Sequence, residues 1–251
     1  MSQICIYQDY VHNNGVLYKA LKNLYPQADI RAIDTVDILK GHLNKDINLF
    51  IMPGGADLYY CDQLNGKGNA LIRGYVENGG TYLGICAGAY YGTKSILWAQ
   101  GTSQEITGPR ELSFCDAIAT GPVSSLIEDG DVEKNWDAVT TLSFDGKEFS
   151  VLYKGGCVFS EPEDEATVLG RYSDLDGQPP AILHTPIGQG HAILSSPHIE
   201  YSPELYARSL VQHLNPAYVR QAQIAEHYKK ICSEHPKPLL KQVLKKAGIE
   251  I

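Results

Sequence analysis

Apolar positions follow two different spacings along the first part of the chain. Short apolar runs, which are typical of buried strands, occur at 4–7, 28–33, 49–52 and 81–85. Between them, apolar residues recur at the three- and four-residue spacing of a helix over 16–24, 35–39 and 69–77. Strands that alternate with helices predict a parallel sheet with right-handed crossovers, which binds ligands at the carboxyl ends of its strands. The pattern therefore indicates an α/β fold.

The pattern becomes mostly β after a helix that is predicted over 87–98. Strands are predicted over 104–112, 114–120, 139–144, 149–153, 166–172, 181–183 and 191–194. A hairpin turn is predicted at Asp145-Gly146, and another turn at Gly188-Gln189-Gly190. This stretch indicates a β-rich region inserted into the α/β domain.

The last part of the chain has the spacing of helices. A helix is predicted from Pro203 to Leu214, and two apolar stripes follow, one through Ala225 and Tyr228 and one through Leu240 and Leu244. Burial against a core is the usual role of such stripes, so we expect them to pack against the domain rather than bind a partner. The chain is thus divided into a domain over 1–214 and a C-terminal helical extension over 215–251.

Composition narrows the class of protein. The chain is 43% hydrophobic and 20% charged, and its net charge of −8 argues against a nucleic-acid or membrane partner. Its six cysteines form no C-x-x-C pair, so neither a zinc centre nor a disulfide scaffold is predicted. No run reaches the length of a membrane span, and the N-terminus enters a strand pattern without a leader. We expect a cytoplasmic protein with a small-molecule substrate and no cofactor or metal; homo-oligomerisation stays open.

The strand over 81–85 runs into a cysteine that is surrounded by small residues. Gly84, Ala87 and Gly88 are what a sharp strand-to-helix turn needs, because larger side chains two positions before or after its tip would collide. Cys86 would stand at that tip, with the positive end of the following helix favouring its thiolate. The alternative is a buried cysteine at an ordinary connection between strand and helix.

Acyl transfer by a cysteine requires a base, an orienting group and donors for an oxyanion. His198 and Glu200 follow a strand at a spacing that can place the carboxylate against the imidazole. The oxyanion donors would be the N–H groups of Ala87 and of Gly55 or Ala56. Singly, each has an ordinary explanation as a loop or surface residue; together they favour a Cys-His-Glu site.

Substrate-binding candidates are less distinctive. Asp57, Tyr60 and Arg110 are polar or aromatic residues that we place at the mouth of the pocket, where an arginine would suit a carboxylate-bearing ligand. The alternative for Arg110 is an exposed, solvated side chain. His184 and His191 flank a turn and could face each other, but two histidines alone make a poor metal site.

These motifs resemble a known superfamily. Pro53-Gly54-Gly55, Gly84-Ile85-Cys86-Ala87-Gly88 and His198-Ile199-Glu200 are similar to motifs of class I glutamine amidotransferase-like domains. A closer resemblance, over 4–214, is to the N-terminal domain of eukaryotic biotin–protein ligases and its free-standing bacterial relatives. It is carried by Gly54-Gly55-Ala56-Asp57-Leu58, Cys86-Ala87-Gly88-Ala89-Tyr90-Tyr91-Gly92, Ala99-Gln100-Gly101, Gly108-Pro109-Arg110-Glu111-Leu112 and Tyr153-Lys154-Gly155-Gly156.

The resemblance implies a flavodoxin-like three-layer sandwich with a mostly parallel central sheet. By position it makes Cys86 the nucleophile, His198 the base and Glu200 the orienting acid. The sequence departs from the amidotransferase pattern at Ile199, where proline is usual. No ligase catalytic domain follows the tail, so we expect that this chain does not itself attach biotin.

Three functions follow from these observations. The first is a cysteine-dependent amidase, hydrolase or amidotransferase-like enzyme that acts on a small amide or related carbonyl compound. The second is a non-catalytic small-molecule-binding or regulatory module that retains the turn at Cys86. The third is a redox or nucleophilic-adduct site at Cys86, against which the pair His198 and Glu200 argues.

Overall fold

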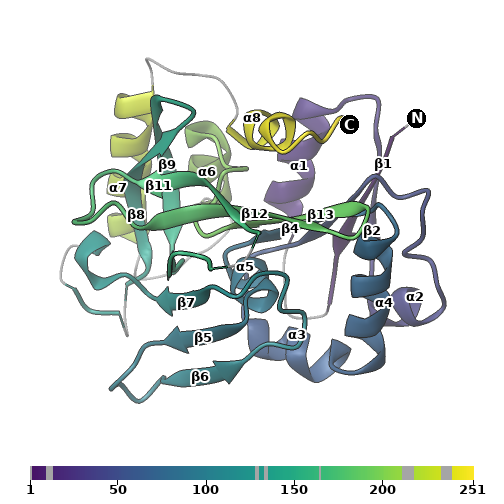
Figure 1. Ribbon diagram of the computed structural model, residues 1–251. Helices are drawn as coiled ribbons and strands as arrows, with labels where there is room; N and C mark the ends of the chain where they lie inside the picture. The colour runs from purple at the N-terminus through teal and green to yellow at the C-terminus, as the bar shows by residue number, and fades with distance from the viewer. Residues whose placement is uncertain are drawn as a thin grey trace.

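The predicted α/β fold is confirmed by the computed structural model. It describes residues 2–9, 14–127, 130–132, 135–163, 165–210, 218–232 and 239–251. A large sheet crosses the molecule between two layers of helices, and a smaller sheet lies below it at one end in the view of Figure 1. The arrangement is the three-layer sandwich that the sequence motifs predict.

The parallel part of the large sheet forms the frame of the fold. It consists of β1 (Gln3–Tyr7), β2 (Asp29–Ile33), β3 (Leu49–Met52), β4 (Thr81–Ile85) and β13 (Gly190–Ser195). Their spatial order is β2-β1-β3-β4-β13, and each neighbouring pair is parallel. This is the flavodoxin-like order, in which ligands bind at the carboxyl ends of the strands. The chain leaves β4 at Cys86 and β13 just before His198, at the same edge of the sheet.

Antiparallel strands extend this sheet beyond β13. They are β12 (Pro180–Ile187), β11 (Thr167–Tyr172), β8 (Asp137–Phe144) and β9 (Lys147–Lys154). The predicted hairpin joins β8 to β9, and both of its turn residues, Asp145 and Gly146, have positive φ, at 49° and 72°. Such a turn matches the twist of the two strands. The end of β9 then brings Lys154 and Gly155 close to Cys86.

The smaller sheet corrects one prediction. It consists of β10 (Val158–Phe159), β7 (Ile118–Gly121), β5 (Ser95–Trp98) and β6 (Ile106–Pro109), whereas a helix was expected to continue to residue 98. The helix after Cys86, α5, is Ala87–Gly92 and ends there. The apolar run Ile96-Leu97-Trp98 instead pairs with β6 on one side and β7 on the other. Non-local strand pairing therefore outweighs the local helical pattern.

Helices cover both faces of the large sheet (Figure 1). They are α1 (Gly15–Leu24), α2 (Thr35–Leu39), α3 (Asp57–Leu64), α4 (Lys67–Glu77), α6 (Pro203–Leu210), α7 (Tyr218–Cys232) and α8 (Leu239–Lys246), with a short 3-10 turn at Ser124–Leu126. The pattern did not predict α3. Leu214, the predicted end of the helix that starts at Pro203, lies outside the described residues, as does the boundary placed between 214 and 215.

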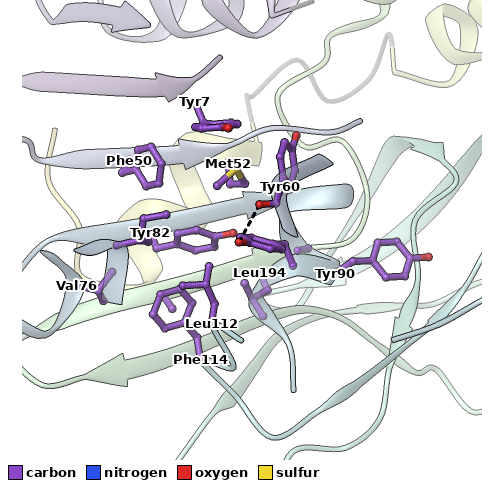
Figure 2. Close-up of a cluster of buried hydrophobic side chains, with 14 of the residues drawn as sticks. Tyr7, Phe50, Met52, Tyr60, Val76, Tyr82, Tyr90, Leu112, Phe114 and Leu194 are labelled. Carbon is purple, nitrogen blue, oxygen red and sulfur yellow. Dashed lines mark hydrogen bonds between the residues drawn. The ribbon is translucent and has the colours of Figure 1, made fainter. Parts of the chain in front are cut away.

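Alternating side chains of the strands divide the core between the two faces. In β1, Cys5 and Tyr7 join the cluster under α3, α4 and α5, whereas Ile4 and Ile6 join the cluster under α1 and α8. The first cluster is rich in aromatic rings, and its tyrosines carry hydroxyls that bond to backbone oxygens (Figure 2). This packing fixes the strand ends from which the site residues project.

The C-terminal stripes pack against the domain as predicted. The buried face of α8 belongs to the core cluster under α1, and Ala225 and Tyr228 of α7 are buried beside Leu152 of β9. The Tyr228 hydroxyl donates a hydrogen bond of 3.0 Å to the backbone oxygen of Tyr201. Within the described residues, no helix combines the length and the apolar character needed to cross a membrane.

Candidate active site

Cys86 occupies a strained turn between β4 and α5. Its φ of 51° lies in the left-handed region, and its N–H donates a hydrogen bond of 2.8 Å to the backbone oxygen of Ser195. A Cβ atom on Gly84 would lie 2.3 Å from the oxygen of Gly88, and one on Gly88 would lie 2.1 Å from the oxygen of Met52. Glycine is thus required on both sides of the turn, as the sequence predicts for a nucleophile elbow.

The helix behind Cys86 is shorter than expected. Because α5 ends at Gly92, its contribution to the field at the sulfur is smaller than that of the long helix predicted over 87–98.

His198 is held from three directions. Its N–H donates a hydrogen bond of 2.9 Å to the backbone oxygen of Leu152, which ties the segment after β13 to β9. Its ring Nδ1 lies 2.7 Å from Oε1 of Glu200, and the ring packs edge-on against Tyr201. Both His198 and Glu200 are buried. A carboxylate on Nδ1 fixes the orientation of the imidazole and leaves Nε2 to face the other way.

Gly54 lies between the imidazole of His198 and Cys86. A Cβ atom at this position would lie 2.8 Å from Cε1 of His198, 3.4 Å from its Nε2 and 3.5 Å from Cβ of Cys86. The two side chains therefore meet at the space that glycine leaves empty. Glu200 lies on Nδ1 of the imidazole, and Nε2 lies on the side of Gly54 and Cys86.

The surroundings of His198 favour its protonated form. Burial alone lowers its pKa, because a buried charge loses hydration. The charge of Glu200 and the hydrogen bonds to Cys86 and Glu200 outweigh burial and raise the pKa of His198 to about 10. Oε2 of Glu200 is buried and has no hydrogen-bond partner within the described residues, so its negative charge is balanced chiefly by the imidazolium.

This shift predicts a pH-dependent stability. The pKa of His198 is about 6.5 when unfolded and about 10 when folded, so protonation stabilises the fold fully below pH 6.5 and this contribution is lost as the pH rises toward 10. Replacement Glu200→Gln removes the charge that raises the pKa and should flatten this loss. Urea unfolding of both proteins across that pH range measures it. Ionisations that are common to both proteins cancel when one curve of unfolding free energy against pH is subtracted from the other. Parallel curves would show that Glu200 does not raise the pKa of His198.

A cavity of about 670 Å³ opens beside Cys86. Gly55, Ala56 and Ala87, the three predicted oxyanion residues, line it next to the sulfur. Asp57 also lines it, as predicted for a residue near the substrate. The Cys86 thiol, small backbone groups and a space for a ligand are therefore found at one edge of the sheet.

Two of the predicted substrate-binding residues lie elsewhere. Tyr60 has no exposed surface and donates its hydroxyl to the Pro53 oxygen at 3.0 Å, so its placement at the cavity mouth is wrong. Figure 2 shows it within the aromatic core. Arg110 is also buried and does not line the cavity, because its Nε donates a hydrogen bond of 2.6 Å to Asp57. Neither the expected pocket-facing arginine nor the exposed alternative describes it.

The structure adds residues that the sequence analysis missed. Tyr90, Trp98 and Trp136 line the cavity, and Trp98 stacks edge-on against both other rings at centroid distances of 5.6 and 5.7 Å. The backbone oxygen of Lys154 accepts a hydrogen bond of 3.3 Å from the Cys86 thiol. Trp98 and Trp136 are the two tryptophans of the chain, and this scarcity was a usable signal, since tryptophan is frequent where proteins bind ligands.

The other cysteines and the pair of His184 and His191 show no arrangement that indicates a metal site. All six cysteines are free thiols, and no group of three potential metal ligands occurs in the described part of the chain. His184 and His191 do face each other across β12 and β13, with ring nitrogens 3.0 Å apart. Without a third ligand this pair is a hydrogen-bonded contact on the sheet.

Comparisons with solved structures support the fold. PurLQS from Thermotoga maritima matches with a TM-score of 0.54 and 16% identity, over 88% of this chain and 96% of that chain. A cold-adapted β-galactosidase from Rahnella matches with a TM-score of 0.51 and 14% identity, over 79% of this chain and 29% of that chain. At such identities the similarity concerns the fold alone.

Comparisons of sequence are more specific. An uncharacterised protein of Chlamydia muridarum is 37% identical over 200 residues, which cover 78% of this chain and 75% of that protein. The biotin–protein ligase of Schizosaccharomyces pombe is 30% identical over 190 residues, but the match covers only 30% of the ligase and 71% of this chain. The family described as biotin-protein ligase, N terminal, matches residues 6–251. The chain therefore belongs to the biotin–protein ligase N-terminal family.

Proposed function

We propose that this protein is a cysteine-dependent amidase or amidotransferase-like enzyme that acts on a small amide or related carbonyl compound. The observation that carries the proposal is the buried pair of His198 and Glu200, 2.7 Å apart, beside the thiol at the cavity wall. A structural cysteine needs no such pair. In this proposal Cys86 is the nucleophile, His198 the acid and base, and Glu200 the group that orients and charges the imidazole.

The first half-reaction forms a thioester. The Cys86 sulfur, its proton transferred to His198, attacks the carbonyl carbon, and the carbonyl π electrons move to the oxygen. The N–H groups of Ala87 and of Gly55 or Ala56 stabilise that oxyanion. When the tetrahedral intermediate collapses, the C–N bond breaks and His198 gives its proton to the leaving nitrogen. The acyl group stays on sulfur and ammonia or an amine departs.

The second half-reaction frees the cysteine. A water molecule, or an amine in the case of transfer, attacks the thioester while His198 accepts its proton. The C–S bond breaks, the acyl product leaves, and the Cys86 sulfur remains as the thiolate beside protonated His198, as before the first attack. Burial of His198 and Glu200 supports this cycle, because their hydrogen bond is protected from competing water.

Trapping of the acyl-enzyme tests the proposal. Incubation with 4-nitrophenyl acetate and with a panel of primary amides, followed by acid quenching and mass spectrometry, should find an acyl group on Cys86. Replacement Gly54→Ala should lower the acylation rate by about 100-fold, because its Cβ would lie 2.8 Å from Cε1 of His198 and displace the ring. Gly74→Ala is the control, since no heavy atom lies within 4 Å of its Cβ. Absence of acyl-Cys86 from every donor would refute the proposal.

A non-catalytic small-molecule-binding module is the second candidate, and one observation favours it. The Cys86 thiol donates its hydrogen bond to the backbone oxygen of Lys154, which is an acceptor but not a base that could take the proton of a nucleophile. The rate of Cys86 alkylation as a function of pH separates the two. A thiolate at neutral pH supports the enzyme, whereas a thiol with the usual pKa of about 8.5 supports the binding module.

A further inference from the structure

Three cationic side chains at the cavity wall or directly behind it are paired with carboxylates. Arg110 lies 2.6 Å from Asp57, Lys154 lies 2.9 Å from Asp137, and His198 lies 2.7 Å from Glu200. Lys154 is the positively charged residue in the cavity lining, and its ammonium also approaches the second oxygen of Asp137 at 3.2 Å. A ligand carboxylate in this cavity would have to compete with these pairs for a positive partner.

Unpaired negative charge stands at the same cavity. Asp62 and Glu105 both line it, both are exposed, and neither forms an ion pair within the described residues. Their hydrogen bonds come from neutral groups, the Gln63 amide and the Gly101 N–H. The two carboxylates therefore give the cavity mouth a negative potential, which attracts cationic ligands and repels anionic ones.

The rest of the wall is aromatic and partly uncovered. Tyr90, Trp98 and Trp136 form a continuous run of edge-on rings, and Trp136 remains 40% exposed. Leu58 and Tyr59 of α3 also line the cavity and are 47% and 41% exposed. Large apolar side chains that remain exposed around a cavity indicate a surface that a ligand covers. A tryptophan face also attracts a cation.

We propose that the Cys86 cavity recognises amides whose non-reacting part is an aromatic ring bearing a positive charge, and that it discriminates against amides bearing a carboxylate. This inference rests on the proposed function, since it names the substrate class of the same site. The ring would lie against Trp98 and Trp136, and the charge would face Glu105 and Asp62. An α-amino acid amide such as glutamine is disfavoured, because its carboxylate would meet those two residues, and the described lining of the cavity offers no unpaired cation.

Two alkylating agents of matched shape test this recognition independently of turnover. One is the chloroacetamide of 4-(aminomethyl)aniline, which is cationic, and the other is the chloroacetamide of 4-aminobenzoic acid, which is anionic. The rate of Cys86 modification by each is read by mass spectrometry and divided by its rate with a small thiol in solution. We expect the cationic agent to react about tenfold faster, a ratio typical of partly screened charge interactions.

Variants test whether the preference for the cationic agent arises from the residues of the cavity. The double replacement Asp62→Asn and Glu105→Gln should reduce the ratio to about one, and Trp98→Leu should slow both agents without reversing their order. The control is a second double replacement, Asp46→Asn with Glu250→Gln, which removes the same charge at exposed positions outside the cavity lining. It should leave the ratio of the two rates unchanged. Equal rates in the wild type, or faster reaction of the anionic agent, would overturn the proposal.

Binding without reaction gives a second measurement. Because both tryptophans of the chain line the cavity, their fluorescence reports on it without background from other positions. In Cys86→Ser, 4-(aminomethyl)benzamide should change this fluorescence at lower concentration than 4-carboxybenzamide or glutamine. If the charge preference appears but no acyl-Cys86 forms in the wild type, the recognition stands and the proposed chemistry fails. If acyl-Cys86 forms without charge preference, the substrate class is wrong and the chemistry stands.

Discussion

Replacement of Cys86 by serine is expected to lower amide turnover by about 10³-fold or more. A hydroxyl is far less acidic than a thiol, and His198, whose pKa is raised to about 10, already favours the imidazolium that accompanies a thiolate. Serine offers no comparable anion, so the attacking species is lost while the cavity keeps its shape. Ammonia release from a turned-over amide measures the effect. Turnover at the wild-type rate would move the chemistry to another residue.

The same position allows a control on stability. Cys86 has a φ of 51°, and residues other than glycine adopt such a backbone angle only at a cost of about 1–3 kcal/mol. Cys86→Gly should therefore raise the free energy of unfolding by about 1 kcal/mol, while Cys86→Ser leaves it nearly unchanged and both abolish turnover. A loss of activity with a gain in stability is a sign that strain is retained for function. Equal stability of all three proteins would argue that the turn is not strained.

Replacement of Gly88 by alanine is expected to have the largest effect on stability. Its Cβ would lie 2.1 Å from the oxygen and 2.7 Å from the carbonyl carbon of Met52, which belong to the backbone of β3. A backbone in the middle of a sheet cannot move aside as a flexible side chain can. We expect a loss of about 3 kcal/mol or more in the free energy of unfolding, measured by urea denaturation.

Gly74 provides the matched control for this prediction. It is also a helical glycine, in α4, but no heavy atom lies within 4 Å of its Cβ position. Gly74→Ala should raise stability by about 0.5–1 kcal/mol, because alanine loses less backbone entropy on folding. The opposite signs of the two substitutions would separate close packing from helix propensity. A stable Gly88→Ala protein would show that α5 can move away from β3.

The sequence predicts the parallel part of the fold well because its central strands are buried and its helices have one apolar face. The four residues of β3, for example, are all buried, and they read as an uninterrupted apolar run. The helix predicted to reach Trp98 was wrong because Ile96 is buried by a second sheet whose partners, β6 and β7, come later in the chain. Local periodicity contains no information about such a partner.

The candidate site, like the fold, could be predicted only in part from the sequence. The placement of Cys86, His198 and Glu200 at one edge of the sheet was predictable, because each follows a recognisable strand and Cys86 stands in a turn that requires glycines. Tyr60 was misplaced because its helix, α3, was not recognised; Asp57, Tyr60 and Leu64 form its buried face at helical spacing. The pair of Arg110 with Asp57 joins two residues distant in sequence, and only tertiary structure reveals that the charge of the arginine is neutralised.

The pairing of β4 with β13 also has a kinetic meaning. The two strands stand side by side, with Thr81 opposite His191 and Ile85 opposite Ser195, although the smaller sheet and the antiparallel strands separate them in sequence. Contacts that close so long a loop form slowly, because the loss of chain entropy precedes the gain from packing. During folding, Cys86 therefore remains without its imidazole and carboxylate until β13 joins the sheet. Assembly of the candidate site is thereby coupled to completion of the fold.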